Sequence, residues 1–281
     1  MKISVIMLTY NHGKYIEKAV QSVCAQQGDF QLEIIIGDDC STDNTAEVID
    51  ELAAKHKEIK IFRPEKNIGM HANLKKCLSL AEGDYISMCE GDDWYISPYK
   101  LQMQMEFLEK NKDCVMCSHS YIEYNQKEDK YSTINYQQDY NGGGIYCFEQ
   151  LVTEYKWTNF TTYMYRKEVI NKLPEFIWEL NGADYSFNMH CAVYGNLGII
   201  KEPLSVYRAG IGQWSSLSLI KQQQDTLDFA YISKEHFHKY YNGKYDDIFD
   251  KRIEKSIKNL KRVKAKAFKN KIRRFFKIKE K

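Results

Sequence analysis

The chain lacks the long apolar segment of a membrane-spanning protein. No stretch approaches eighteen consecutive apolar residues, whereas a transmembrane helix needs about 20. The apolar run near Met1 is too short for a secretory signal, and no small-residue cleavage site follows it. We therefore expect a cytoplasmic protein.

Two widespread phosphate-binding motifs are also absent. No Gly-x-Gly-x-x-Gly follows a strand-like run, and no Gly-Lys-Ser/Thr closes a phosphate loop. Dinucleotide oxidoreductases and P-loop NTPases are therefore disfavoured. A nucleotide site without a glycine cradle would need carboxylates and a metal ion to bind a diphosphate.

Cysteine is sparse and scattered. The chain has eight cysteines among 281 residues, and only Cys114 and Cys117 have the spacing of metal ligands, with no second such pair. A single pair is weak evidence for a metal site, and reduced cysteines fit a cytoplasmic protein. We expect the cysteines to serve mainly as small buried hydrophobic residues.

The charge is distributed very unevenly, although the net charge is only +2. Residues 251–281 hold 15 Lys and Arg against two Glu, which leaves residues 1–250 acidic. Apolar residues in this tail recur on one face of a helix: Ile253, Ile257, Leu260, Phe268, Ile272, Phe275 and Ile278. Such a helix suits an anionic membrane surface. Alternatively, the stripe packs on the body of the protein, or the tail binds nucleic acid. We expect no nucleic-acid partner, because the body shows no basic or aromatic platform for one.

Strand-like and helix-like runs alternate along the first hundred residues, and 43% apolar composition is enough for a core. We expect strands at residues 3–9, 32–37, 59–62 and 85–89, with a helix after each. Ser41 or Thr42 is the expected cap of the second helix. Ser97 and Pro98 are the expected N-cap and first residue of the fourth, with 90–96 as a loop before it. The pattern predicts an α/β fold with a mostly parallel sheet.

Two acidic clusters each follow one of these strands. They are residues 37–43 (GDDCSTD) and 90–94 (EGDDW). Because the carboxyl ends of parallel strands share one edge of a sheet, both clusters should lie at the usual ligand crevice. Carboxylates there can hold a nucleotide and a divalent cation. The chain therefore has the pattern of an enzyme.

Helix capping is the alternative explanation for these acidic residues. Asp43 is placed to cap or charge the second helix, so we leave it out of the site. For Asp92 and Asp93 capping is less suitable, because Ser97 and Pro98 already begin the next helix. Three acidic groups in four positions also repel one another without a cation.

These segments resemble the family 2 glycosyltransferases, which have the GT-A fold, a Rossmann-like sheet flanked by helices. The similarity comprises residues 4–12 (SVIMLTYNH), 33–43 (EIIIGDDCSTD), 67–70 (NIGM) and 90–94 (EGDDW), in the family's order. Residues 182–184 (GAD), 198–208 and 214–216 (WSS) extend it to about residues 1–216. The EGDDW form is similar to that of bacterial surface-polysaccharide glycosyltransferases.

The resemblance implies a nucleoside diphosphate sugar donor, a UDP-sugar, and a divalent cation, Mn²⁺ or Mg²⁺, held by Asp92. Asp184 would be the catalytic base that takes a proton from the acceptor hydroxyl, and a single displacement would invert the anomeric centre. The donor-binding residues that it implies are Thr9, Tyr10, Asn11, Asp38, Asp39, Asn67, Gly69, Glu90 and Asp92.

The chain departs from the family pattern in one place. The family branch usually has His soon after a Tyr-Arg pair, but Tyr207 and Arg208 are followed by residues 209–212 (AGIG). The cation would then be held by Asp92, the diphosphate and water, or be bound weakly, or activity would be lost. No Gln-x-x-Arg-Trp motif follows, so transfer of one sugar is favoured over a processive synthase.

The expected organisation is a nucleotide-sugar half at residues 1–114, an acceptor-binding and catalytic half at 115–216, and a helical region with the basic tail at 217–281. The acceptor would be a saccharide or a lipid-linked saccharide, with the tail on the inner membrane face. Aromatic residues of the second half could stack on sugars or simply pack: Tyr121, Tyr124, Tyr131, Tyr136, Tyr140, Tyr146, Trp157, Tyr163 and Trp178.

Two other classes of function remain open. A non-catalytic binding or scaffold module with the same fold would be consistent with the missing His. A sugar nucleotidyltransferase would share the α/β core and the metal, but it should have a Gly-rich basic loop after the first strand, which residues 10–14 (YNHGK) barely supply.

Overall fold

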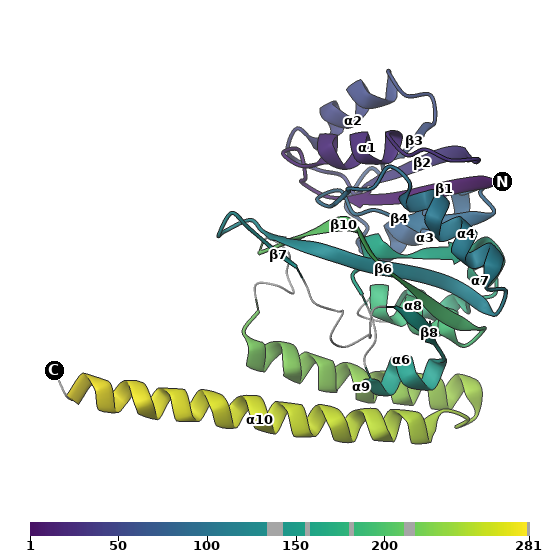
Figure 1. Cartoon of the computed structure of the whole chain (residues 1–281). Coiled ribbons are helices and arrows are strands. Elements are labelled where there is room, and N and C mark those ends of the chain that lie inside the picture. The colour runs from purple at the N-terminus through teal and green to yellow at the C-terminus, as the bar shows by residue number, and fades with distance from the viewer. Residues whose placement is uncertain (134–142, 155–157, 180–182, 211–216, 280–281) are drawn as a thin grey trace. The chain divides into compact units, whose positions relative to one another are not determined.

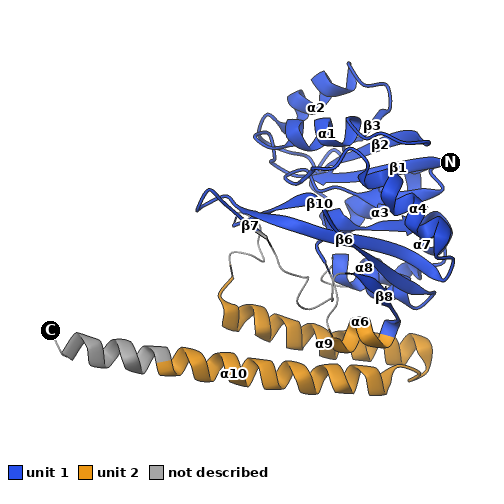
Figure 2. Ribbon diagram, viewed as in Figure 1, with its two compact units in different colours: residues 1–148, 156–210 blue, residues 149–155, 211–281 orange. Residues whose placement is uncertain are grey.

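The computed structural model describes residues 1–133, 143–154, 158–179, 183–210 and 217–279, with side chains described as far as Lys269. The chain divides into two compact units (Figure 2). Unit 1 comprises residues 1–148 and 156–210, and unit 2 comprises residues 149–155 and 211–281. Each unit is described by itself.

A mixed β-sheet is the centre of unit 1 (Figure 1). The four strands expected from the sequence form its parallel half, in the order β3-β2-β1-β4. They are β1 (Lys2–Thr9), β2 (Gln31–Asp38), β3 (Ile59–Phe62) and β4 (Tyr85–Met88). The predicted α/β architecture is confirmed.

The other strands continue the sheet beyond β4 in the order β9-β6-β10-β5. The central pair β6 and β10 is parallel, while β9 runs antiparallel to both β4 and β6. The bounds are β5 (Trp94–Tyr95), β6 (Cys114–Asn125), β7 (Lys130–Thr133), β8 (Gly144–Tyr146), β9 (Met164–Arg166) and β10 (Asn196–Ala209).

Helices connect the strands, as the alternating pattern predicts. Those of unit 1 are α1 (Ile16–Cys24), α2 (Thr45–Ala53), α3 (Met70–Leu80), α4 (Lys100–Lys110), α7 (Lys167–Ile170) and α8 (Ala183–Ala192), with short 3-10 turns η1 (Phe160–Thr162) and η2 (Glu175–Glu179). In α1, Ile16, Ala19, Val20 and Val23 are buried, which is the face that the helical spacing predicts.

Both helices begin later than predicted, although the Ser97 hydroxyl still accepts a hydrogen bond from the Tyr99 amide at 3.2 Å. Helix α2 begins at Thr45, and neither Ser41 nor Thr42 caps it. Instead, a carboxylate oxygen of Asp43 accepts a hydrogen bond from the Thr45 amide at 3.0 Å, because the turn through Cys40 delays the start of the helix. Helix α4 begins at Lys100, two residues later than expected.

The expected loop at residues 90–96 also contains a short strand. Trp94 and Tyr95 pair in antiparallel fashion with Val206 and Ser205 of β10. Local sequence could not show this pairing, because the partner strand lies more than a hundred residues later. The pairing fixes the second acidic cluster to the far half of the sheet.

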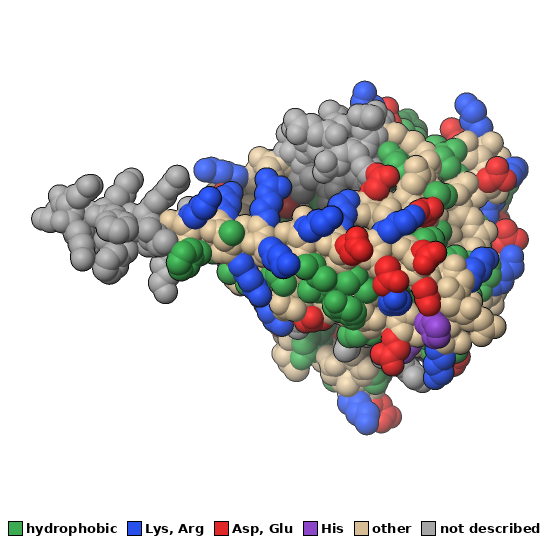
Figure 3. Space-filling view, turned by 90° about the horizontal axis from the view of Figure 1, so that it is seen from below, with side chains coloured by type: hydrophobic (Ala, Val, Ile, Leu, Met, Phe, Trp, Pro, Cys, Tyr) green, Lys and Arg blue, Asp and Glu red, His purple; other side chains and the backbone are tan. Residues whose placement is uncertain are grey.

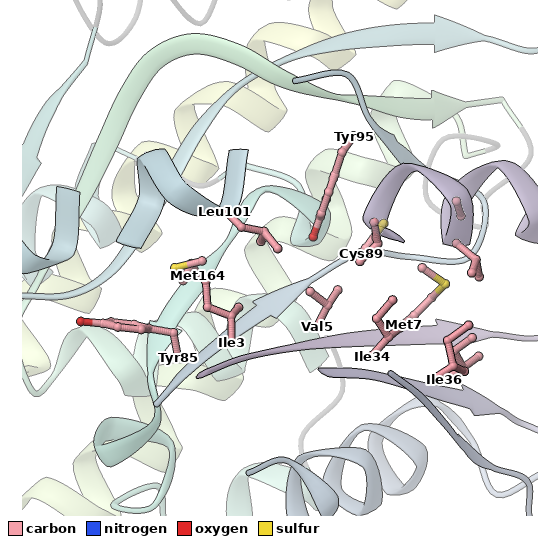
Figure 4. Close-up of a cluster of buried hydrophobic side chains, with 14 of the residues drawn as sticks. Ile3, Val5, Met7, Ile34, Ile36, Tyr85, Cys89, Tyr95, Leu101 and Met164 are labelled. Carbon is pink, nitrogen blue, oxygen red and sulfur yellow. The ribbon is translucent and has the colours of Figure 1, made fainter. Parts of the chain in front are cut away.

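The core of unit 1 lies between the sheet and its helices. Val5, Met7, Ile34 and Ile36 of the parallel strands pack there with side chains from α1 and α4 (Figure 4). Cys77, Cys89, Cys114, Cys117 and Cys191 are buried, as expected for small apolar residues, whereas Cys147 is exposed.

Two basic side chains of this unit are buried, Lys100 and Arg208, and Lys100 is the more deeply buried of the two. The Lys100 ammonium donates a hydrogen bond to the Ser87 hydroxyl at 2.8 Å and lies 3.9 Å from the centre of the Tyr95 ring. Burial lowers the pKa of Lys100 to about 7.

Unit 2 is a helical hairpin with one short helix. It consists of α9 (Leu219–Tyr241), α10 (Asp246–Lys279) and most of α6 (Phe148–Glu154). Asn242 and Gly243 have φ values of 49° and 72°, the left-handed conformation that ends a helix and reverses the chain. Lys251 of α10 forms an ion pair with Glu149 of α6 at 2.7 Å.

Part of the apolar stripe of the basic tail is buried within unit 2. Ile253 and Leu260 of α10 are buried against Leu227 and Ala230 of α9, while Phe268 is 65% exposed. Lys and Arg side chains line the outer side of α10 (Figure 3). Among the residues searched, no helix has both the length and the apolarity to span a bilayer.

Candidate functional site

The carboxyl end of β1 holds both acidic clusters. The Asp39 amide donates a hydrogen bond to the Thr9 carbonyl at 3.0 Å, and the Gly91 amide donates one to the Leu8 carbonyl at 2.9 Å. Because β1 lies between β2 and β4, the loops that follow those two strands meet at its end. The structure therefore brings the clusters together at one edge of the sheet, as the sequence predicts.

In the first cluster, Asp39 orders the predicted donor segment at residues 67–70. One carboxylate oxygen of Asp39 accepts from the Ile68 amide at 2.7 Å, and the other accepts from the Gly69 amide at 2.9 Å. Gly69 has φ of 82°, a conformation that favours glycine. Asn67 and Gly69 are exposed beside this contact.

Asp38 is fully buried, and its carboxylate is already paired. It accepts from the Ser41 amide at 3.1 Å and forms an ion pair with Arg63 at 3.0 Å. Its predicted contact with the donor therefore depends on the family resemblance alone.

The β1–α1 loop joins the first cluster through Asn11. Its side-chain oxygen accepts a hydrogen bond from the Thr42 amide at 2.8 Å, and its φ is 58°. The neighbouring Tyr10 is 45% exposed, whereas Thr9 is only 3% exposed. An exposed ring next to a fixed loop is available to stack on a flat ligand such as a nucleobase.

In the second cluster, Asp93 is a fixed anchor. One carboxylate oxygen accepts from the Arg208 amide at 2.8 Å, and the other accepts from the Thr161 hydroxyl. Thr161 also accepts a hydrogen bond from the Glu90 amide at 3.1 Å, and the Arg208 guanidinium donates to the Asp92 carbonyl at 2.8 Å. The loop is thus held from η1 on one side and from β10 on the other.

Glu90 and Asp92 are placed differently from Asp93. Burial raises the pKa of Glu90 well above its usual value, and the nearby charges of Asp93, Asp92 and Asp184 raise it further. The Asp92 carboxylate is partly exposed and has no hydrogen-bond partner among the described residues. A free carboxylate beside other carboxyl groups is an electrostatically unsatisfied arrangement.

Asp184 reaches this acidic loop from the start of α8. It lies close enough to Glu90 to raise that residue's pKa, although the two are far apart in the sequence. Burial also raises the pKa of Asp184 itself, against the hydrogen bond that its carboxylate accepts from the Tyr185 amide at 2.8 Å. A raised pKa suits a base that must accept a proton near neutral pH.

Two buried polar atoms face the second loop without a partner among the described residues. They are the Thr9 hydroxyl oxygen and Nδ1 of His12. A Cβ added to Gly91 would lie 2.7 Å from the first and 3.0 Å from the second. Only glycine therefore fits at this position.

The donor set of the second loop fits a hard divalent cation. Mn²⁺ and Mg²⁺ prefer oxygen ligands such as carboxylates, and the unpaired Asp92 carboxylate supplies one. A bound cation would also offset the repulsion that raises the pKa of Glu90. Asp93 is less suitable as a ligand, because both of its oxygens are engaged.

Sequence reasoning missed Thr161 and the role of Arg208. Arg208 also packs against the rings of Tyr15, at 4.3 Å, and Trp94, at 5.0 Å. The Tyr-Arg pair could have indicated a contact with the acidic loop, but Thr161 has no recognisable motif. Arg208, the second residue of that pair, positions the loop from β10.

The aromatic residues of the second half do not share one role. Tyr163 is fully buried, whereas Tyr131 is 62% exposed and stacks near Tyr124, with ring centres 4.7 Å apart. Both alternatives, core packing and availability to a ligand, therefore occur. Tyr136, Tyr140, Trp157, Gly182 and residues 214–216 lie outside the described residues.

Comparison with known proteins identifies what the site resembles. A family model described as glycosyl transferase family 2 matches residues 4–176. A Mycobacterium tuberculosis protein described as uncharacterised is 31% identical over 221 residues, which cover 76% of this chain and 61% of that protein. This chain therefore spans less than two thirds of that relative.

Two solved structures share the fold. S. aureus TarS 1–349, in complex with UDP-GlcNAc, has a TM-score of 0.69 and 19% identity, covering 92% of this chain and 72% of that one. The mannosyltransferase PcManGT from Pyrobaculum calidifontis, with GDP-Man and Mn²⁺, has a TM-score of 0.62 and 16% identity, covering 94% and 74%. The predicted GT-A fold is confirmed.

Proposed function

This chain belongs to glycosyl transferase family 2, and we propose that it transfers one sugar from a nucleoside diphosphate sugar to a hydroxyl group of a saccharide or lipid-linked saccharide. The observation that carries this proposal is the convergence of both acidic clusters at the carboxyl end of β1, where the Asp39 and Gly91 amides bond the Thr9 and Leu8 carbonyls. Asp184, whose charge contributes to the raised pKa of Glu90, would be the base.

The first cluster would bind the nucleoside. Asp39 shapes the 67–70 segment, and Asn11 fixes the β1–α1 loop, so that the exposed Tyr10 can lie against the base. Asp39 keeps further lone pairs with which it could accept hydrogen bonds from uracil or ribose. We favour a UDP-sugar, in line with the UDP-GlcNAc complex of TarS, although PcManGT carries GDP-Man.

Asp92 would hold the divalent cation, Mn²⁺ or Mg²⁺, with Glu90 beside it. When bound, such a cation supplies positive charge that stabilises the leaving diphosphate. The protein fixes the loop from behind through Arg208 and Thr161, so Asp92 need not move to meet its ligand.

Asp184 would accept the proton of the acceptor hydroxyl as that oxygen attacks the anomeric carbon. The attack from the side opposite the leaving diphosphate inverts the anomeric centre. Because burial raises the pKa of Asp184, the proton transfer is better matched to neutral pH than it would be for an ordinary aspartate. The leaving diphosphate departs with the bonding electron pair.

The acceptor would belong to the synthesis of a cell-surface polysaccharide, such as a capsule or lipopolysaccharide. We propose that residues 251–281 hold the enzyme at the inner face of the membrane. Ile253 and Leu260 are buried against α9, so the contact would depend on the exposed lysines and on Phe268 and the residues after it. Deleting residues 263–281 should abolish binding to anionic vesicles without abolishing nucleotide binding. Unchanged vesicle binding would rule out a membrane-binding role for the tail.

Calorimetric titration tests the donor site. UDP, with GDP as the control, is titrated into the wild type and Asp92→Ala, with and without Mn²⁺. We expect uridine-selective binding that needs the metal and is lost in the variant. If neither nucleotide binds under any metal condition, a non-catalytic scaffold is favoured. Synthesis of a nucleotide sugar from a sugar phosphate and a nucleoside triphosphate would instead indicate a nucleotidyltransferase.

A further inference from the structure

We propose that Cys24, His56 and Glu58 form a second metal site, which binds a divalent transition-metal ion of the zinc class. One ligand atom from each side chain, a sulfur, a ring nitrogen and a carboxylate oxygen, lies within 4.8 Å of the other two. This is the only such group found among the described residues. It is independent of the glycosyltransferase proposal.

The three side chains come from two segments at the amino edge of the sheet. Cys24 is the last residue of α1, while His56 and Glu58 lie in the connection between α2 and β3. The acidic loops follow the carboxyl ends of the strands, so this cluster lies at the opposite edge. A metal here would fasten α1 to the start of β3 and would not take part in the reaction.

Backbone hydrogen bonds hold the ligands in place. The Glu58 carbonyl accepts from the Ile34 amide at 2.9 Å, which fixes Glu58 to β2, and the His56 carbonyl accepts from the Ile59 amide at 3.1 Å. Cys24 packs on the core beside α1. A site whose ligands are already ordered loses little conformational freedom on binding.

The side chains already interact with one another. Nδ1 of His56 lies 3.1 Å from a carboxylate oxygen of Glu58, and the Cys24 sulfur lies within 4.8 Å of both ligand atoms. Ligand atoms around a tetrahedral zinc ion are roughly 3.5 Å apart, given bond lengths of about 2.0–2.3 Å. Small side-chain rotations would therefore bring the three atoms around one ion.

The ligand types select the metal. Thiolate, imidazole and carboxylate together favour Zn²⁺ over Mg²⁺ or Mn²⁺, which prefer oxygen ligands alone. His56 and Glu58 keep 33% and 26% of their side-chain surface exposed, so a water molecule can complete a fourth position. Binding would release the Cys24 thiol proton to solvent as the sulfur–metal bond forms.

Cobalt spectroscopy tests this proposal on the full, metal-free chain. Co²⁺ bound through a thiolate gives a sulfur-to-metal charge-transfer band in the near ultraviolet, whereas Co²⁺ held by carboxylates gives none. We expect one cobalt per chain with this band, and displacement of the cobalt by Zn²⁺. Zinc at a hundredfold excess over its dissociation constant should raise the melting temperature by roughly 5 °C.

Matched variants assign the band to these residues. Cys24→Ser and Glu58→Gln should lose the band and the zinc-dependent shift, with folding checked by circular dichroism. Cys147→Ser removes the exposed cysteine and should retain both, and Asp92→Ala should retain both because its metal site is separate. Absence of the band in the folded wild type, or its survival in Cys24→Ser, would overturn the proposal.

Discussion

The two acidic clusters look alike in the sequence but differ in how their charges are satisfied. In the first, Asp38 pairs with Arg63, and Asp39 accepts two backbone amides. In the second, only the Asp93 carboxylate is paired in this way, while the Asp92 carboxylate has no partner among the described residues and Glu90 lies among like charges. The first cluster stabilises the shape of a loop, whereas the second leaves like charges close together, which is the basis for the cation that we propose there.

This difference separates stability from function. A carboxylate that accepts protein hydrogen bonds costs stability when it is removed, because its donors are left unpaired. Removing a carboxylate that repels its neighbours costs little stability, so stability does not explain why such a carboxylate is present. Substitutions in the first cluster should therefore cost more stability than matched substitutions in the second, and the following predictions separate effects on stability from effects on function.

The largest effect is expected at Asp184. Asp184→Asn keeps the size of the side chain but cannot accept the proton, so kcat should fall by about 10²–10⁴. The UDP-sugar dissociation constant should stay within about twofold, as measured by calorimetry. A parallel loss of donor affinity would show that Asp184 binds the donor and is not the base.

The next effect is expected at Thr161. Thr161→Val keeps the shape but removes the hydroxyl that bonds Asp93 and the Glu90 amide. Loss of a group that supports a metal loop commonly weakens metal affinity by about 10–100-fold. A titration of Mn²⁺ against activity measures this effect. Thr162→Val, at the neighbouring buried threonine, is the control for general loosening of η1.

A loss of stability is expected at Asp39. Asp39→Ala leaves the Ile68 amide without its acceptor and the Gly69 amide with only the longer bond to Oδ1 of Asn67 at 3.2 Å, which should lower the free energy of unfolding by about 1–3 kcal/mol. Asp92→Ala, the matched change in the second cluster, should leave it within about 0.5 kcal/mol. Urea denaturation of both variants compares them. Equal losses would contradict the distinction between the clusters.

The smallest effect is a difference in pH dependence. Burial raises the pKa of Asp43, but the hydrogen bonds that its carboxylate accepts from Thr45 and Gly13 together outweigh burial, so the pKa is lowered. The ionised Asp43 therefore stabilises the fold at neutral pH. This contribution is lost as the pH falls through the pKa of the folded state. The pKa of Glu90 is raised, so stability falls as the pH rises from its ordinary value of 4.5 to the folded value.

Thermal unfolding between about pH 2 and pH 8 measures these two slopes, because the Asp43 contribution is lost below pH 3.8. Glu90→Gln should remove the loss of stability that occurs as the pH rises. Mn²⁺ should reduce that loss of stability in the wild type but not in Asp92→Ala. Asp43→Asn should reduce the loss on the acid side only. A Glu90→Gln variant with an unchanged profile would show that Glu90 does not carry the repulsion.

Much of this molecule was predictable from local pattern. Short apolar runs predicted the four parallel strands, and their ends placed both acidic clusters at one edge. Helix starts were less predictable, because Ser41 and Ser97 are good caps in isolation while the chain turns differently in the fold. The sequence of residues 251–281 also could not show how much of their apolar stripe is free to meet a membrane, because α9 covers part of that stripe.

The sequence by itself determined the α/β order, the position of the acidic motifs and the basic character of the tail, because periodicity and charge are local properties. Only the tertiary structure decided which carboxylates are satisfied, since Arg63, Thr161 and Arg208 come from distant segments. It also buried Lys100 and placed Cys24 beside Glu58. Hydrogen bonding and desolvation depend on neighbours in space, and no local pattern specifies those neighbours.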